Sequence, residues 1–269
     1  MIEVKPRNKY SNSTPANSEY QILGHPSGNL NKSIELALFN EHRFAFYYWL
    51  KWNLNKDFKK APDLITFDWH QDLAYPCETI KSELEKLDLN NKFEISFFSW
   101  ARLNTLNDDH ILAATYLNQL NDIWVVCKQN HFSDWDDEEI IDFQGKKHII
   151  RKFPNKDKLF EQLVKSKISN IYLDIDLDYF TVENSTSNDK NKFTYMRKKE
   201  IEQIFSVDSD FMNWIFQRMD GFTLALEPEH TGGISKSLKY LSLLNKILFE
   251  GEILHWNCNW KHLKRNYSR

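Results

Sequence analysis

Short apolar runs alternate with longer amphipathic stretches along most of the chain. Each short run is bounded by polar or turn-forming residues, which predicts strands over 34–39, 64–67, 123–126, 171–177 and 222–226. Apolar residues recur at helical spacing elsewhere, which predicts helices over 43–52, 78–87, 103–120 with a break at Asn107-Asp108, 157–167, 198–205, 210–219 and 234–249. This alternation is typical of an α/β fold with a mostly parallel central sheet flanked by helices.

Three segments depart from this pattern. Residues 1–19 are polar and rich in Asn and Ser, so we expect a flexible N-terminal arm, with residues 20–269 forming a single domain. Residues 129–147 contain the acidic run 134–139 and are expected to form a surface excursion or hairpin. Residues 181–191 are predicted to be a polar loop that could cover a site as a lid.

Composition excludes several functional classes. The 35 basic and 38 acidic residues give a net charge of −3 without a dense basic patch, which argues against nucleic acid as a partner. Dinucleotide and P-loop motifs are absent. Cys77, Cys127 and Cys258 lack metal or redox spacing and indicate reduced thiols, as in a cytoplasmic protein. No apolar stretch approaches the roughly 20 residues of a membrane span, so no membrane association is expected.

Acidic side chains follow the apolar parts of two predicted strands. Asp174, Asp176 and Asp178 alternate with apolar residues, so the three acids share one face of an extended segment. The sequence Asp-Trp-His-Gln-Asp, residues 68–72, follows the strand over 64–67. In parallel sheets, ligands bind at the carboxyl ends of the strands. That edge is predicted to collect His42, Asp68, His70, Asp72, Asp174, Asp176 and Glu227.

So many like charges are costly in one place unless cations lie among them. Carboxylates with a minority of imidazoles suit Mn²⁺, Mg²⁺ or Fe²⁺. Two such ions would lower the pKa of a water molecule and present it to an electrophilic carbon, so the pattern predicts hydrolysis. Taken alone, either motif is common on a solvated edge strand or at a helix cap; their joint occurrence with Glu227 favours the metal site.

The two motifs resemble those of the ureohydrolase superfamily, which includes arginase and agmatinase and, more distantly, histone deacetylases. The family's Asp-x-His-x-Asp corresponds to residues 68–72 and its Asp-x-Asp strand to residues 174–176. The resemblance implies a three-layer, arginase-like α/β fold holding two Mn²⁺ ions. It implies that Asp68 and Asp174 bridge the ions, with His42 and Asp72 completing one coordination shell and His70 and Asp176 the other. The chain departs from the family at residues 39–42, where Phe-Asn-Glu-His replaces Gly-Gly-Asp-His.

Residues 174–180 and 226–233 resemble the atypical peptide arginases, which convert arginine residues of ribosomally made precursor peptides into ornithine and release urea. This implies an arginine-containing precursor peptide as the partner, with Glu227 binding the guanidinium and Glu229 as a second candidate. No histidine lies between residues 72 and 100 to serve as the family's proton shuttle, so we expect His230 to act as the acid, with His110 as the alternative. Asp178 could be a further ligand, a partner that supports His70 or a cap for the following loop, and support of His70 is the preferred interpretation.

Two other functions remain open from the sequence. The same site could hydrolyse a small free guanidine, such as arginine or agmatine, or an acylated amine. The chain could also be a non-catalytic module that uses its metal site to bind a precursor peptide. A homo-oligomer is compatible with either function.

Overall fold

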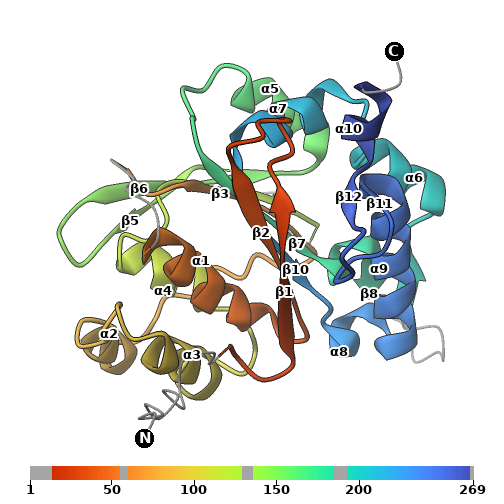
Figure 1. The fold of residues 1–269 in the computed structure, drawn as a ribbon. Helices are drawn as coiled ribbons and strands as arrows, with labels where there is room; N and C mark the ends of the chain where they lie inside the picture. The colour runs from red at the N-terminus through yellow and green to blue at the C-terminus, as the bar shows by residue number, and fades with distance from the viewer. Residues whose placement is uncertain (1–13, 55–59, 129–135, 184–192, 267–269) are drawn as a thin grey trace, which may run out of the picture.

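A computed structural model describes residues 14–54, 60–128, 136–183 and 193–266 (Figure 1). Its central sheet has eight strands, in the order β1 (Ser18–Gly24), β2 (Ser33–Phe39), β10 (Met219–Ala225), β7 (Ile171–Asp176), β3 (Asp63–Asp68), β4 (Ile123–Cys127), β6 (Lys147–Phe153) and β5 (Glu138–Ile141). The six inner strands are parallel, and only the edge strands β1 and β5 pair antiparallel with their neighbours. The mostly parallel sheet predicted from the sequence is therefore confirmed.

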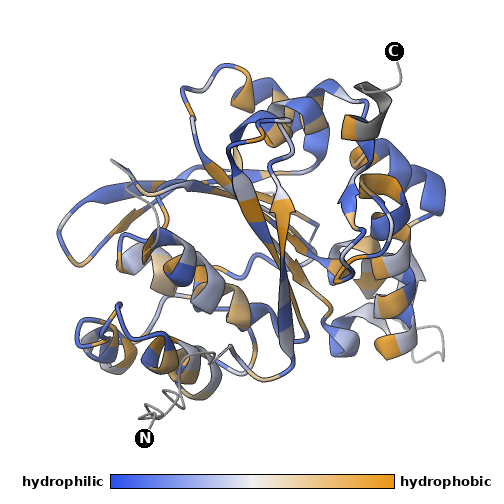
Figure 2. Cartoon of the chain, viewed as in Figure 1, coloured by the Kyte–Doolittle hydropathy of each residue, from blue (hydrophilic) through white to orange (hydrophobic). Residues whose placement is uncertain are grey.

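Helices cover both faces of this sheet. One face packs against η1 (His42–Phe44), α1 (Ala45–Leu54), α2 (Glu78–Leu84), α3 (Lys92–Ala101) and α4 (His110–Tyr116). The other packs against η2 (Leu177–Phe180), α5 (Lys156–Leu163), α6 (Lys198–Ile204), α7 (Asp210–Arg218) and α9 (Ile234–Leu248). Strands contribute alternate residues to the two cores: Tyr172 packs on the first, and Leu173 on the second. Figure 2 shows the apolar positions concentrated in the strands and on the inward helix faces. The three-layer prediction is confirmed.

Short elements complete the chain. A small hairpin pairs β8 (Thr181–Glu183) with β9 (Phe193–Tyr195), and the single-turn helix α8 (Pro228–Thr231) follows the sheet strand β10. Near the C-terminus, β11 (Phe249–Glu250) pairs with β12 (Asn259–Trp260), and α10 (Lys261–Asn266) follows. Residues 1–13 of the predicted arm, 134–135 of the acidic run and 184–191 of the predicted loop lie outside the described residues. None of the helices in the described ranges combines the length and apolar character needed to cross a bilayer.

Two predicted segments differ from the structure. The helix expected over 103–120 is reduced to α4, because Asp109 accepts hydrogen bonds from the Asn104 N–H at 3.0 and 3.1 Å and closes residues 104–109 into a loop. Of the segment 129–147, expected to be a surface excursion or hairpin, the described part contains β5, which forms an antiparallel hairpin with β6; the pair belongs to the central sheet, because β6, which begins at Lys147, runs parallel to β4. The charges of β6 are accommodated by partners: Arg151 lies 4.5 Å from the centre of the Trp124 ring and pairs with Asp122 at 3.2 Å.

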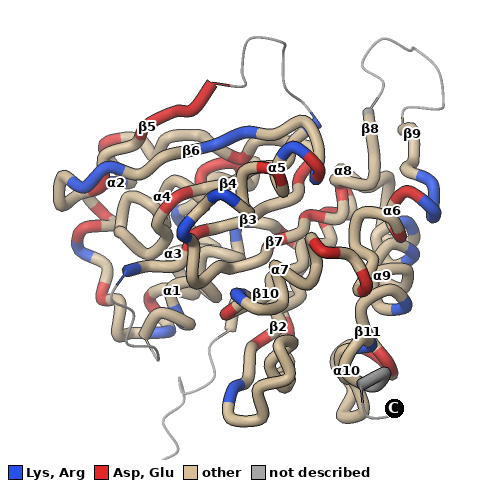
Figure 3. Tube along the Cα trace, turned by 90° about the horizontal axis from the view of Figure 1, so that it is seen from above, with Lys and Arg blue, Asp and Glu red and all other residues tan. Residues whose placement is uncertain are grey.

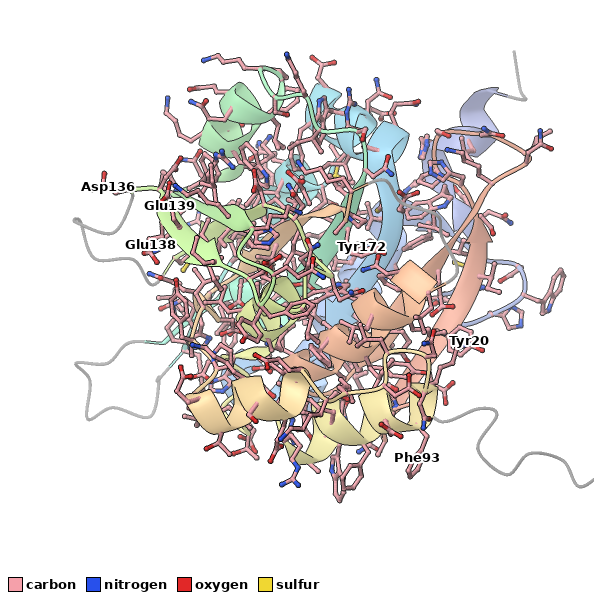
Figure 4. The ribbon with its side chains drawn as sticks, turned by 90° about the vertical axis from the view of Figure 1, so that its left-hand side faces the viewer. Tyr20, Phe93, Asp136, Glu138, Glu139 and Tyr172 are labelled. Carbon is pink, nitrogen blue, oxygen red and sulfur yellow. The ribbon has the colours of Figure 1, made fainter. Side chains whose placement is uncertain are left out.

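The sequence pattern also failed to predict α3. Its aromatic residues lie on both sides of the helix, so they show no clear helical stripe. Phe98 is buried, whereas Phe93 and Phe97 are 44% and 47% exposed. Figure 4 shows Phe93 directed outward from the helix, in contrast to Tyr172, which lies inside the molecule.

Candidate metal centre

Four adjacent parallel strands end at one edge of the sheet, as the sequence predicts. They lie in the order β2, β10, β7 and β3, and each delivers an acid or a histidine to this edge. In Figure 3, acidic positions gather where β3 and β7 run towards α8. The residues delivered are His42 after β2, Glu227 after β10, Asp174 and Asp176 at the end of β7, and Asp68 at the end of β3.

The imidazole of His42 lies among four carboxylates and is fully buried. Its Nδ1 is 2.9 Å from Asp72 Oδ2 and 3.2 Å from one oxygen each of Asp68 and Asp176. Its Nε2 is 2.7 Å from Asp174 Oδ2. The structure therefore brings His42, which ends the segment where the chain departs from the family motif, to the middle of the predicted ligand set.

Asp174 is held by the strands on both sides of β7. It is in register with Thr66 of β3 and Thr223 of β10, and both hydroxyls donate to its carboxylate, at 2.8 and 2.5 Å. With His42 Nε2 as a third partner, this carboxylate orients the histidine ring. The bridging role expected for Asp174 stays a prediction.

Asp178 supports His70, which stands at the rim of the cluster. The Asp178 Oδ2 atom lies 2.8 Å from His70 Nδ1, and its Oδ1 accepts the Trp69 N–H at 3.0 Å. The carboxylate thereby fixes both the ring and the backbone of the segment that follows β3. His70 is partly exposed, with 26% of its side chain accessible, whereas Asp178 is completely buried.

His110 joins the cluster from α4. It is fully buried; its Nδ1 is 2.9 Å from the Asn107 carbonyl oxygen, and its Nε2 has no hydrogen-bond partner among the described residues. Its ring centre lies 4.3 Å from that of His42. Burial, followed by the proximity of His42, lowers the pKa of His110 well below its ordinary value, which keeps the ring neutral and able to act as a metal ligand.

Potential ligand atoms converge in four overlapping groups, within each of which the atoms lie within 4.8 Å of one another. The groups overlap because His42, Asp68, Asp72 and Asp176 each belong to two of them. The groups in the described part of the chain are His42, Asp72 and His110; His42, Asp68 and Asp176; Asp68, His70 and Asp72; and Asp176, Asp178 and Glu227.

The electrostatics of the cluster call for further cations. Burial raises the pKa values of Asp68 and Asp176 well above the usual range, and raises that of Asp72 to about 6. Burial acts to lower the pKa of His42, but the Asp174 carboxylate and the other surrounding acids raise it well above its ordinary value. A single imidazolium cannot neutralise these acids together.

The residues fit a pair of divalent ions. Oxygen donors dominate, imidazole nitrogens are the minority, and no cysteine takes part, which suits Mn²⁺ or a similar ion. The buried Asp68 Oδ2 accepts no hydrogen bond from any described residue, although His42 Nδ1 lies 3.2 Å away. A buried carboxylate oxygen without a donor is a position at which a cation would be stabilised.

Glu227 lies beside the cluster in a strained backbone conformation. Its φ of 35° is left-handed, and it lies two residues after the end of β10 and immediately before α8. Its Oε1 accepts the His42 N–H at 3.0 Å and the Asn107 side-chain N–H at 2.5 Å. Burial raises its pKa to about 8. The contact with Asn107 could not be predicted from the sequence, where Asn107 was only a helix break.

The other predicted site residues lie farther out. His230, on α8, has its Nε2 3.9 Å from Glu227 Oε2, and 39% of its side chain is accessible. Its ring centre is 5.0 Å from that of His70, so it faces both the metal-ligand set and the opening to solvent. Glu229 is exposed on α8 and lies outside the buried cluster.

Comparisons with known proteins found similar structures only. No protein-family model and no curated protein matches the chain. Similar solved structures include an agmatine ureohydrolase of Thermoplasma volcanium (14% identity, TM-score 0.38) and the arginases of Helicobacter pylori (14%, 0.40) and Entamoeba histolytica, the last in complex with L-ornithine (11%, 0.39). The matches cover 77%, 78% and 77% of this chain, and 59%, 72% and 68% of the respective structures.

The chain thus spans less than two thirds of the length of the agmatine ureohydrolase. These structures come from the superfamily that the two aspartate motifs resemble. Sequence identity to these structures and structural overlap with them are both low.

Proposed function

We propose that this protein is a ureohydrolase-type enzyme that depends on two metal ions, preferably Mn²⁺, and converts arginine residues of a precursor peptide into ornithine and urea. The observation that carries this proposal is the convergence of Asp68, Asp176 and His42 in one buried cluster with Glu227 beside it. Two divalent ions bound there would activate water and stabilise the negative charge that develops during hydrolysis.

Glu227 and Asn107 would bind the guanidinium. Glu227 offers a carboxylate to a planar cation, the geometry that best recognises a guanidinium group. The Oδ1 of Asn107 is buried and accepts no hydrogen bond from the described residues, so it offers a second acceptor for a guanidinium N–H. Because burial disfavours the ionised form of Glu227, a cationic substrate would stabilise that form.

His230 would move the proton that the reaction requires. Water adds to the guanidinium carbon, the bond from that carbon to the side-chain nitrogen breaks, and the departing amine takes up a proton, leaving urea. His230 lies near Glu227 and is open to solvent, so it can deliver this proton and recover it from bulk water. Buried His110 has no such access; its place beside His42 and Asp72 supports a ligand role instead.

The peptide context of the arginine is supported by the resemblance of residues 226–233 to the peptide arginases.

The deciding experiment incubates the Mn²⁺-loaded protein with an arginine-containing precursor peptide and measures urea release together with the mass change from arginine to ornithine. Free arginine and agmatine are tested in parallel, and Mg²⁺ and Zn²⁺ replace Mn²⁺ in separate reactions.

We expect urea from the peptide, a much lower rate with free arginine, and none from a folded Asp176→Ala variant. Circular dichroism establishes that the variant is folded. Turnover confined to free arginine or agmatine would point to a small-molecule ureohydrolase. Tight peptide binding without urea from any substrate would identify a binding module.

A further inference from the structure

A lysine-rich groove lies between α9 and the segment that joins β9 to α6. Its volume is about 390 Å³, and Figure 1 shows α6 and α9 on the same side of the molecule. Figure 3 shows basic positions along both helices. The groove is lined by four lysines, Lys198, Lys236, Lys239 and Lys246, and by Tyr195, Met196, Tyr240, Ser242 and Leu243.

Within the described residues, the positive charge of the groove is largely unbalanced. Lys236, Lys239 and Lys246 share one face of α9 with Tyr240, as their spacing requires, and α9 contains no acidic residue. Lys198 pairs with Glu202 at 3.4 Å. Since the whole chain has a net charge of −3, this concentration of lysines is a local feature.

Two contacts connect the groove to the candidate metal centre. Tyr195, in the wall of the groove, packs closely on Gly232: a Cβ added at Gly232 would lie 2.6 Å from the hydroxyl oxygen of Tyr195. Gly232 directly follows α8, the helix that carries His230. Tyr240 donates a hydrogen bond to the Phe180 carbonyl at 3.0 Å, and Phe180 ends η2, which begins directly after Asp176. One chain bound in the groove could therefore continue over α8 to the metal centre.

We propose that this groove binds an acidic segment of the peptide substrate; the inference rests on the proposed function. Lys236 and Lys246 are ten residues apart on a helix, which corresponds to about 15 Å. A single small anion cannot reach both, whereas about five residues of an extended peptide span that length. Carboxylates at alternate positions would meet the ammonium groups, and Tyr240 and the lysine stems would contact the intervening side chains.

The test measures binding without turnover. A fluorescent peptide with several Asp and Glu residues and no arginine is titrated with the protein, and its isosteric Asn/Gln counterpart serves as the neutral probe. The Lys239→Glu/Lys246→Glu variant is compared with Lys165→Glu/Lys167→Glu, which makes the same charge change at exposed lysines after α5. We expect the first variant to bind the acidic peptide roughly tenfold more weakly, and the second to bind like the wild type.

Salt should weaken binding of the acidic probe far more than that of the neutral probe. Equal affinity for the two probes, or equal weakening by the two variants, would overturn the proposal. With arginine peptides, an acidic segment should lower KM without changing kcat, and this advantage should vanish in Lys239→Glu/Lys246→Glu. Because the probe contains no arginine, peptide binding by the groove can be measured even if the protein releases no urea. If the protein releases urea but shows no preference for the acidic probe, the groove proposal is refuted and the proposed function is not.

Discussion

The donors around each carboxylate distinguish its role in the candidate metal centre. Asp174 is bonded to two threonine hydroxyls and to His42, whereas Asp68 Oδ2 has no hydrogen-bond donor among the described residues. Asp178 contacts the His70 ring and the backbone before it. From these contacts we expect Asp68 to bind ions directly and Asp178 to orient His70; Asp174 orients His42, and the bridging role expected for Asp174 stays a prediction.

Replacing Asp178 with Asn tests the supporting role of this carboxylate. The amide oxygen can still accept the Trp69 N–H, but the charge facing His70 Nδ1 is lost, so the ring is less firmly oriented and less basic. We expect Mn²⁺ affinity to fall roughly 10- to 100-fold while the protein stays folded. Calorimetric titration with Mn²⁺ measures this, and Glu229→Gln, at an exposed position, is the control. Unchanged affinity in Asp178→Asn would exclude the role.

The roles of His230 and His110 are distinguished by measuring the metal content and kcat of their alanine variants. His230→Ala should keep both ions and lower kcat on the order of 10²- to 10⁴-fold, because it removes an acid but no ligand. His110→Ala should instead weaken metal binding, because His110 offers a ligand atom within 4.8 Å of ligand atoms of His42 and Asp72, and its Nε2 has no hydrogen-bond partner among the described residues. Metal loss in His230→Ala together with full metal content in His110→Ala would reverse these assignments.

At the scale of elements, the sequence predicts the strands β2, β3, β4, β7 and β10, but it misses β1, β5 and β6, and β1 begins within the expected N-terminal arm. It also predicts poorly the loop that completes the site. An apolar run followed by a polar residue predicts both a strand and the side chain that lies at its carboxyl end. For this reason His42, Asp68 and Glu227 could be placed at one edge of the sheet. Asn107 and His110 arrive through a loop whose position depends on a tertiary contact, the hydrogen bond from Ala74 N–H to the Asp108 carbonyl at 2.8 Å. No local pattern encodes such a contact, so these residues could not be placed.

Gly221, in β10, is required by the packing of α1 on the sheet. A Cβ at this position would lie 2.4 Å from two ring carbons of Trp52, a buried residue of α1. Gly221→Ala should therefore lower the free energy of unfolding by about 1–3 kcal/mol. Urea denaturation measures the change. Gly24→Ala, also in a strand but with nothing within 4 Å of the added Cβ, should have a much smaller effect. Similar losses in both variants would show that strand propensity, and not contact with Trp52, is responsible.

At the scale of the whole molecule, two cores stabilise a sheet edge that is electrostatically unfavourable without cations. The layers on both faces keep the carboxylates out of water, and burial raises the pKa of Glu227 to about 8. The free energy of the metal-free protein should therefore depend on protonation, and metal ions should replace the protons.

The resulting pH dependence can be assigned to Glu227 by comparing the wild type with Glu227→Gln. Because the folded state raises this pKa, the folded protein binds the proton more tightly than the unfolded chain, and the associated stability is lost as pH rises through about 8. Burial acts to lower the pKa of His70, but Asp178 raises it to about 9, so His70 also makes stability fall as pH rises. Burial lowers the pKa of Lys128 to about 8, so Lys128 makes stability rise with pH and opposes this effect. Glutamine mimics protonated Glu227 and removes only its contribution.

Without metal, the midpoint of thermal unfolding of Glu227→Gln should therefore rise relative to the wild type between pH 7 and 9, by an amount on the order of 5 °C. Differential scanning fluorimetry in EDTA measures the two midpoints across this range. Mn²⁺ should stabilise the wild type increasingly over the same interval, because its ligands give up their protons to bind the ion. A difference between variant and wild type that stays constant from pH 7 to 9 would mean that Glu227 is already ionised in the metal-free protein, and that the cluster tolerates its charge without a cation.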